Sequence, residues 1–264
     1  YNVAGKVFEA LGAKVILISA SPDGMNINDS CGSQYPKTLI ETVCRDKADF
    51  GIAFDGDGDR VLFVDAEGRT YDGDKLLYII ASYRKSKGDL GGGVVGTLMT
   101  NLGMERALKE LNIDFCRAGV GDRYVFEKLK ERKWKLGGES SGHIICMDKH
   151  STGDGIISAL QVLASIADTG KGLNELCANL KEVPQILINI PVDDSYRIES
   201  DKKVSEVTDE MAAKFGDEGR ILIRSSGTES VVRVMVEGVD RTLIKKVATS
   251  LSSLIEERNK AYQV

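Results

Sequence analysis

An acidic loop is the stretch of this sequence whose residue types most directly suggest chemistry. It reads Asp-Gly-Asp-Gly-Asp-Arg over residues 55–60 and follows the apolar run 50–54. Three carboxylates at alternate positions repel one another, by about 4 kcal/mol for each close pair near a protein surface, unless a cation lies among them. The intervening glycines allow a tight turn in which side chains two residues apart converge. Because hard oxygen ligands suit Mg²⁺ or Ca²⁺, we predict a metal site at Asp55, Asp57 and Asp59.

Other interpretations of the acidic loop fit less well. A calcium EF-hand needs glycine at its sixth position and glutamate at its twelfth, where this sequence has Arg60 and Ala66. A dehalogenase-type phosphatase also places Asp-x-Asp after a strand, with the first aspartate as nucleophile. It is the weaker competitor, because a third aspartate and an arginine crowd the loop. A solvated acidic turn is the structural alternative, and charge repulsion argues against it.

A second polar cluster, Gly-Glu-Ser-Ser-Gly-His at residues 138–143, combines a carboxylate, two hydroxyls and one of the two histidines. A single histidine is more often structural. Here the flanking glycines and hydroxyls favour a site that hydrogen-bonds several hydroxyl groups of one sugar-like ligand. An imidazole at His143 would also suit proton transfer near neutral pH. The other histidine, His150, is interpreted as loop surface.

Arginines and hydroxyls cluster in a third stretch, Arg-Ser-Ser-Gly-Thr-Glu at residues 224–229, with Arg233 close behind. Phosphate is held by arginine guanidinium groups, by hydroxyls and by backbone N–H groups that a neighbouring glycine leaves accessible. A plain hairpin turn needs neither two arginines nor three hydroxyls, so we predict an anion site here. Residues 120–124, Val-Gly-Asp-Arg-Tyr, leave two alternatives open: a helix cap at Asp122 with an exposed Arg123, or a substrate loop.

A glycine-rich stretch at residues 91–96 matches the dinucleotide-binding pattern G-x-G-x-x-G in its letters only. In that pattern the glycines link a strand to a helix. Here they precede the predicted strand 94–98, and no lysine follows to make a P-loop. A hinge between domains is the better interpretation.

The elements that must position these loops alternate between helix and strand up to about residue 167. Apolar spacing and Gly or Pro punctuation predict helix 3–11, strand 14–19, helix 36–47, strands 49–54 and 61–65, a helix 75–84 capped by Asp72 or Asp74, a boundary at 85–93, strand 94–98, helix 101–111, strand 113–118, helix 122–132, strands 134–138 and 143–147, and a helix from 155 to 167. Such alternation predicts right-handed crossovers and mostly parallel sheets.

The last part of the sequence has a different order. We predict strand 185–191, helix 200–215, strands 220–224 and 231–237, and helix 240–260. This order indicates an α+β domain with an antiparallel sheet and helices on one face. The predicted fold class is therefore two α/β domains with mixed or parallel sheets, at 1–88 and 89–182, followed by a smaller α+β domain at 183–264.

Composition excludes some classes of function. The net charge of −5 over 264 residues argues against a general nucleic-acid binder. No apolar stretch approaches the roughly 20 residues that span a bilayer, so no membrane partner is expected. The five cysteines are scattered and form no Cys-x-x-Cys pair, which favours a reducing compartment and predicts a cytoplasmic protein. The sequence starts at Tyr1 inside a helical pattern, so we expect that residues precede it in the natural protein.

The motifs at 55–60, 138–143 and 224–229, in this order and at this spacing, resemble the alpha-D-phosphohexomutase superfamily. Further segments along the chain support this resemblance: GIAFDGDGDR, VGTLMTNLGME, VGDRYV, TGDGI, PQILINI and RVMVEG. Within this superfamily, the sequence is most similar to bacterial members that act on a phosphorylated amino sugar. The resemblance implies four domains around a cleft, a phosphoserine donor and Mg²⁺ as cofactor. It also implies that the 6- and 1-phosphates of glucosamine are interconverted through a bisphosphate, and it leaves a homodimer open.

The resemblance gives each candidate residue a role. It implies that Mg²⁺ is held by Asp55, Asp57 and Asp59. Arg60 would lie beside the transferring phosphoryl group, and the imidazole chemistry described above makes His143 the candidate for proton transfer. The sugar hydroxyls would be bound by Glu139, Ser141 and His143, with Arg123 in the same cleft. The phosphate that does not react would be held by Arg224, Ser226, Gly227, Thr228 and Arg233.

Two departures from the family pattern bear on activity. The family's nucleophile loop, Thr/Ala-Ser-His-Asn-Pro, is absent, and Ser-Ala-Ser-Pro at residues 19–22 lacks the His-Asn pair. The chain therefore resembles the last three domains, without the opening strand of the second, and we expect no turnover from it alone. Ser230 stands where the family has proline after Gly-Thr-Glu, which would loosen that loop slightly. A phosphomannomutase or phosphoglucomutase, and a non-catalytic phosphosugar-binding protein, are the alternatives.

Overall fold

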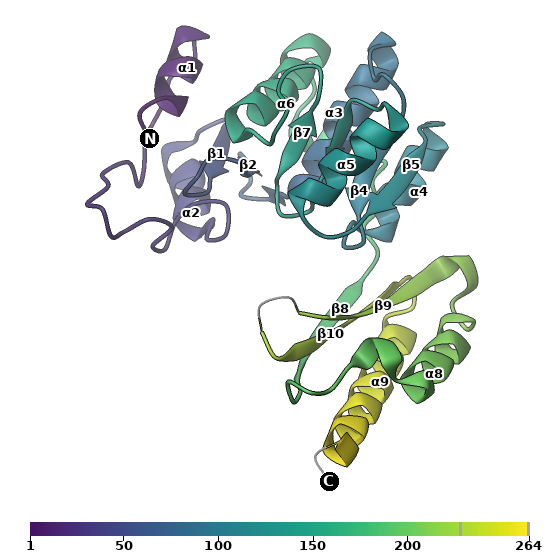
Figure 1. Ribbon diagram of the computed structural model, residues 1–264. Coiled ribbons are helices and arrows are strands. Elements are labelled where there is room, and N and C mark those ends of the chain that lie inside the picture. The colour runs from purple at the N-terminus through teal and green to yellow at the C-terminus, as the bar shows by residue number, and fades with distance from the viewer. Residues whose placement is uncertain (227–228, 263–264) are drawn as a thin grey trace. The chain divides into compact units, whose positions relative to one another are not determined.

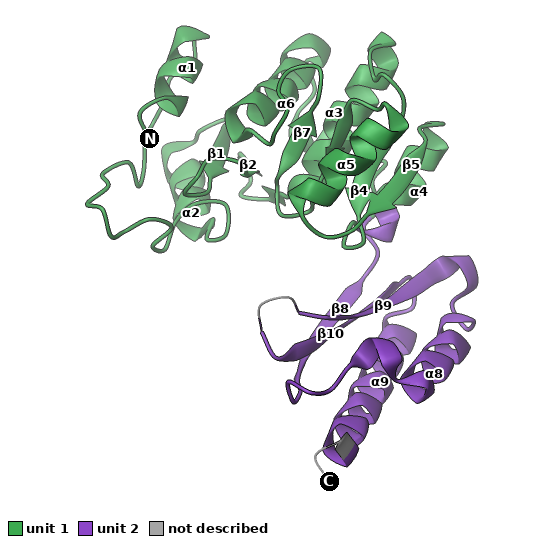
Figure 2. Ribbon diagram, in the orientation of Figure 1, with its two compact units in different colours: residues 1–100, 104–181 green, residues 101–103, 182–264 purple. Residues whose placement is uncertain are grey.

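The computed structural model describes residues 1–226 and 229–262 and forms two compact units (Figure 1, Figure 2). Unit 1 contains residues 1–100 and 104–181, and unit 2 contains residues 101–103 and 182–264. The short segment 101–103 belongs to unit 2 because the Asn101 amide pairs with the Val183 backbone. Its Nδ2 donates to the Val183 carbonyl at 3.1 Å, and its Oδ1 accepts from the Val183 N–H at 3.0 Å.

A three-stranded antiparallel sheet carries the acidic loop in unit 1. Its strands, in sheet order, are β1 (Phe50–Phe54), β2 (Val61–Asp65) and β3 (Thr70–Tyr71). The helices beside it in the sequence are α1 (Ala4–Ala10) and α2 (Lys37–Asp46), and α2 packs on β1 and β2. Parallel neighbours need a crossover of a dozen or more residues, so the short connection 55–60 makes β1 and β2 a hairpin.

The strand predicted at 14–19 is wrong, and so is the parallel pairing predicted for this first sheet. Among the described residues, 14–19 have no regular secondary structure, and β1 pairs only with β2. Ile16 and Leu17 are about half exposed. The β-branched run has the composition of a strand, but a strand also needs a neighbour with which to hydrogen-bond, and none lies beside it here.

A four-stranded mixed sheet forms the second half of unit 1. Its strands, in sheet order, are β5 (Phe115–Ala118), β4 (Val94–Thr97), β6 (Leu136–Gly138) and β7 (Ile144–Cys146). The helices are α3 (Gly73–Lys87), α4 (Leu102–Glu110), α5 (Asp122–Arg132), α6 (Gly155–Thr169) and the short α7 (Leu173–Leu176), which the sequence did not predict. β4 runs parallel to β5 and β6, whereas β7 is antiparallel to β6. The parallel pairing predicted for this part is therefore confirmed, and the right-handed crossovers stay a prediction.

One continuous core connects the two sheets of unit 1. Phe63 on β2, Leu77 and Ile80 on α3, and Val94 on β4 are all fully buried in one cluster. α3 packs on β2, β6 and α6, so its inner face serves both sheets. Its N-cap is Asp72, one of the two predicted caps, whose side chain accepts from the Lys75 N–H at 3.1 Å.

Unit 2 is an antiparallel sheet with helices packed on it. Its elements are β8 (Gln185–Pro191), α8 (Lys202–Ala212), β9 (Gly219–Ser225), β10 (Val231–Gly238), α9 (Arg241–Tyr262) and two 3₁₀ turns, Ile198–Ser200 and Gly216–Glu218. The strand order is β8-β10-β9, and α9 packs on β8 and β10 while α8 packs on β9. Together with the mixed sheet of unit 1, this arrangement confirms the predicted fold class, including the α+β character of the last part. Among the described helices, none is both long enough and apolar enough to cross a bilayer.

Candidate metal, sugar and phosphate sites

The acidic loop between β1 and β2 brings its three carboxylates together. Asp55, Asp57 and Asp59 each offer one oxygen, and these atoms lie within 4.8 Å of one another. The backbone sets this shape. Gly58 has φ +73°, and its N–H donates to the Asp55 carbonyl at 3.2 Å. The Arg60 N–H donates to Asp55 Oδ1 at 3.1 Å, which fixes the first carboxylate.

The charges around this cluster are only partly compensated. Arg60 Nε lies 3.7 Å from Asp55 Oδ2 and 3.9 Å from Asp59 Oδ1, beyond hydrogen-bond distance. In the described part of the chain, Asp59 Oδ1 and Arg60 Nε are buried without a hydrogen-bond partner. Burial, together with the charges of Asp55 and Asp57, raises the pKa of Asp59 against the opposing influence of His143. Three oxygen donors with an unsatisfied buried oxygen fit a hard divalent cation such as Mg²⁺.

His143 joins the acidic loop to the loop between β6 and β7. Its ring is buried, and Nε2 lies 3.4 Å from Asp59 Oδ2. The two loops are also paired through the backbone, by an isolated antiparallel bridge between Arg60 and His143 and by the Val61 N–H, which donates to the Gly142 carbonyl at 3.1 Å. The predicted metal residues and the predicted sugar loop are thus parts of one structure in unit 1.

Glu139 is held by the loop that precedes α5. Its Oε1 accepts from the Gly121 N–H at 2.9 Å, and its own N–H donates to the His143 carbonyl at 2.9 Å. Ser141 is exposed. Arg123, in the first turn of α5, is also exposed, and its Nε donates to Glu127 Oε1 at 2.8 Å. The N-cap position is Gly121, so of the two alternatives left open for residues 120–124 the one with a cap at Asp122 is off by one residue, and the substrate loop stays a prediction.

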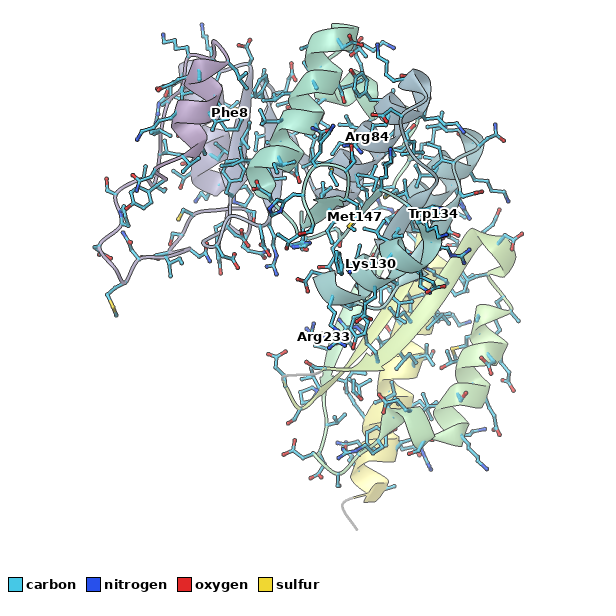
Figure 3. The ribbon with its side chains drawn as sticks, turned by 45° about the horizontal axis from the view of Figure 1, so that its top comes forward. Phe8, Arg84, Lys130, Trp134, Met147 and Arg233 are labelled. Atoms are coloured by element: carbon cyan, nitrogen blue, oxygen red, sulfur yellow. The ribbon has the colours of Figure 1, made fainter. Side chains whose placement is uncertain are left out.

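Two arginines lie side by side on the sheet of unit 2. Arg224 on β9 and Arg233 on β10 are direct cross-strand partners, and Figure 3 labels Arg233 on this sheet. Like charges placed opposite each other destabilise a sheet unless an anion lies between them. Burial and the charge of Arg233 lower the pKa of Arg224. Within the described residues, Arg233 Nε is buried without a hydrogen-bond partner. The pair is therefore suited to an anion.

The rest of the predicted phosphate site is described in part. Arg233 Nη2 donates to Glu229 Oε2 at 2.8 Å and to Ser226 Oγ at 3.4 Å. Gly227 and Thr228 lie outside the described residues. The metal and sugar residues belong to unit 1 and the arginine pair belongs to unit 2. Their use on one substrate is therefore part of the proposal below.

Sequence reasoning missed several residues that shape these sites. Gly153 leaves room for His143, because a Cβ there would lie 2.2 Å from Nε2. Gly73, the first residue of α3, lies against the sugar loop, because a Cβ there would lie 1.9 Å from the Glu139 carbonyl oxygen. No local pattern signals either contact.

The glycine run at 91–93 has a packing explanation. A Cβ at Gly92 would lie 2.3 Å from Trp134 Cδ1, and one at Gly93 would lie 2.7 Å from Trp134 Cη2. Figure 3 labels Trp134 in unit 1. The run therefore accommodates the only tryptophan of the chain. His150 is exposed, as the sequence indicated.

Comparison with known proteins identifies the class. The chain matches three descriptions of one family, phosphoglucomutase/phosphomannomutase: alpha/beta/alpha domain II over residues 1–68, alpha/beta/alpha domain III over 72–183, and the C-terminal domain over 187–253. It belongs to this family, within the alpha-D-phosphohexomutase superfamily, and the resemblance seen in the motifs is confirmed. The domain III match starts before the boundary predicted at 88/89, and that boundary stays a prediction.

Individual relatives give a narrower likeness. The chain is 50% identical over 255 residues to phosphoglucosamine mutase of Aromatoleum aromaticum and 50% identical over 258 residues to that of Neisseria meningitidis serogroup C. These matches cover 97% and 96% of this chain but only 56% and 58% of the relatives. Among solved structures, N-acetylphosphoglucosamine mutase of Aspergillus fumigatus, in complex with GlcNAc-6P and magnesium, has a TM-score of 0.76 at 22% identity. That match covers 96% of this chain and 63% of the other, and it shows the shared fold.

Proposed function

We propose that this chain supplies the metal-, sugar- and phosphate-binding parts of a phosphosugar mutase. The reaction interconverts glucosamine 6-phosphate and glucosamine 1-phosphate through a phosphoserine and a bisphosphorylated intermediate. The observation that carries the proposal is the direct junction of the three-aspartate cluster with the sugar loop, through Asp59 and His143 at 3.4 Å. Metal and sugar residues must be adjacent for phosphoryl transfer to a sugar hydroxyl, because this chemistry consists mostly of positioning and charge neutralisation. The names of the relatives support the choice of substrate.

The residues of the acidic loop would have two different roles at the phosphoryl group that is transferred. Asp55, Asp57 and Asp59 would hold Mg²⁺, which when bound neutralises charge on phosphoryl oxygens. Arg60 would donate hydrogen bonds from its guanidinium to the same group, since its Nε is without a hydrogen-bond partner in the described residues. The Asp55 carboxylate and the Arg60 backbone are joined in the same turn, so the carboxylates and the guanidinium would act at one place.

The sugar loop would orient the hydroxyl that reacts. Glu139 and Ser141 would accept and donate hydrogen bonds to sugar hydroxyls, with Arg123 beside them. His143 would exchange a proton with a hydroxyl while its Nε2 faces Asp59. The hydrogen bond from Gly121 to Glu139 would keep this carboxylate in one orientation before the sugar binds.

The arginine pair of unit 2 would hold the phosphate that does not react. Arg224 and Arg233 provide two guanidinium groups on adjacent strands, and Ser226, Gly227 and Thr228 lie between them in the sequence. One clamp can serve both phosphates of the intermediate in turn, provided that the sugar reorients between the two transfers. We also propose that the protein is cytoplasmic, because all five cysteines are free thiols.

Binding by the purified chain tests this function. We expect isothermal titration calorimetry to detect glucosamine 6-phosphate in the presence of Mg²⁺, with weaker binding of mannose 6-phosphate and glucose 6-phosphate. The comparison also decides the main alternative, because the family description names phosphoglucomutase and phosphomannomutase. Tighter binding of mannose 6-phosphate or glucose 6-phosphate, which lack the amino group, would refute the amino-sugar assignment. Absence of binding to all three sugar phosphates would refute the proposed site.

Turnover is a separate question. The sequence contains no Ser-His-Asn-Pro loop to supply the phosphoserine. We therefore expect no formation of glucosamine 1-phosphate by this chain alone, even with Mg²⁺ and glucose 1,6-bisphosphate present. Appreciable turnover in a coupled assay would show that another residue of this chain is the nucleophile, and the mechanism above would be wrong.

A further inference from the structure

We propose that Glu229 is an internal competitor of the phosphate and sets the affinity of the clamp in unit 2. The proposal rests on the function proposed above, because it concerns the same arginine pair. In the structure, the carboxylate of Glu229 already occupies a donor of that pair. Arg233 Nη2 donates to Glu229 Oε2 at 2.8 Å, whereas Arg224 makes no hydrogen bond or ion pair with any described side chain.

The chemistry of the two anions is similar enough for them to compete. A carboxylate and a phosphate both offer planar or near-planar pairs of oxygens to the guanidinium fork. Nη2 carries two N–H groups, which already donate to Glu229 Oε2 at 2.8 Å and to Ser226 Oγ at 3.4 Å. A phosphate that takes the shorter of these two hydrogen bonds must displace Glu229. The displaced carboxylate has somewhere to go, because its side chain is 62% exposed and can be hydrated.

The geometry indicates a weak competitor. An ion pair with one exposed partner contributes about 0.2–1 kcal/mol in most double-mutant cycles, which corresponds to an equilibrium constant of about 1.4–5 for the closed contact. The apparent affinity for phosphate is divided by one plus this constant, so it falls by about two- to sixfold. A competitor of this strength screens the facing arginines when the clamp is empty without preventing binding.

A weak competitor also suits an enzyme that must release and recapture phosphate. In the proposed reaction, the clamp holds one phosphate, lets the bisphosphorylated sugar turn, and then holds the other. An over-tight clamp would stabilise the bound state without stabilising the transition state, which does not raise the rate. Each time a phosphate leaves the clamp, the renewed contact of Glu229 with Arg233 would offset part of the binding energy that the two arginines had provided.

The test is phosphate binding by the full chain, followed through the arginine side-chain N–H signals in NMR at constant ionic strength. Inorganic phosphate is the probe. Glu229→Gln keeps the size of the side chain and removes its charge, and Glu229→Asp keeps the charge but shortens the reach to Arg233. Glu206→Gln, on the exposed surface of α8, is the matched control for a change of one charge in the same unit.

We expect Glu229→Gln and Glu229→Asp each to lower the dissociation constant of phosphate by about two- to sixfold, and Glu206→Gln to leave it unchanged. If phosphate binds the unaltered chain and all three variants equally, the competitor proposal is overturned while the clamp stands. If only Glu229→Gln binds more tightly, charge alone acts and the contact with Arg233 is irrelevant, which also overturns it. If phosphate shifts no arginine signal in any of the proteins, the clamp itself, and with it the proposed function, fails.

Discussion

Gly153→Ala tests whether His143 must occupy its observed position. The added Cβ would lie 2.2 Å from His143 Nε2, 2.5 Å from Cε1 and 2.6 Å from Cδ2. Ordinary contact begins at 3.4 Å, so the ring must retreat or turn by about 1.2 Å, the difference between 3.4 and 2.2 Å. The ring is buried, with 3% of its side chain exposed, and has little room in which to move. Overpacking of this kind costs about 1–3 kcal/mol.

The chain offers a selective probe and a matched control for this measurement. Trp134 is the only tryptophan and lies in unit 1, so its fluorescence during urea unfolding reports on that unit. Gly172→Ala is the control, because a Cβ there meets only Glu175 Oε2 at 3.8 Å and the backbone φ of −74° is ordinary. We expect Gly153→Ala to lower the free energy of unfolding by about 1–3 kcal/mol and Gly172→Ala by well under about 1 kcal/mol.

Metal binding provides the second readout of the same substitution. Movement of the His143 ring changes its 3.4 Å separation from Asp59 and thereby the charge balance of the aspartate cluster. The dissociation constant of Mg²⁺ follows from the rise of the free energy of unfolding with Mg²⁺ concentration. We expect it to change in Gly153→Ala and to stay constant in Gly172→Ala. Equal unfolding free energies and equal Mg²⁺ dissociation constants for the two variants would refute the reasoning, because the ring would then have room that the structure does not show.

Three further predictions address the remaining parts of the site. Asp57→Asn should abolish the stabilisation of unit 1 by Mg²⁺, which for the unaltered chain should reach about 2.7 kcal/mol at 100 times the dissociation constant; thermal unfolding with and without EDTA measures it. Arg224→Ala should weaken inorganic phosphate binding at least tenfold in calorimetry, because one guanidinium of the cross-strand pair is lost. Burial opposes ionisation of Asp201, but hydrogen bonds, chiefly from Arg258, prevail and lower its pKa below 3.8. Unit 2 should therefore keep this stabilisation above about pH 4 and lose it as the pH falls through the lowered value, and Asp201→Asn should flatten that dependence in circular dichroism.

Much of the fold follows from local sequence signals. Strand β2 and helix α5 have the predicted bounds, because an apolar β-branched run and a clear helical spacing end at polar or glycine residues. Strand direction was not predictable from the same signals. The run at 14–19 has the composition of a strand, but its pairing depends on a neighbour far from it in the sequence. The antiparallel hairpin of β1 and β2, by contrast, could have been inferred from the short connection 55–60.

The candidate site also has one part that the local sequence predicts and one part that it does not. The acidic loop is predictable because adjacent residues make it, and the structure brings Asp55, Asp57 and Asp59 together. Whether these carboxylates bind a metal stays a prediction. The junction of Asp59 with His143 was not predictable, because it depends on a bridge between residues 60 and 143. Register between distant segments is a tertiary property, and no local pattern in either segment encodes it.

The two motifs of unit 1 share one structural setting. Each lies largely in a short connection between adjacent antiparallel strands: residues 55–60 between β1 and β2, and 139–143 between β6 and β7. A ladder on both sides fixes the two ends of such a loop, so its side chains are positioned by the sheet. For the acidic loop this matters most, because three carboxylates repel one another by about 4 kcal/mol per close pair when no cation is bound. The β1–β2 ladder, the turn at Gly58 and the hydrogen bond from the Arg60 N–H supply the opposing restraint.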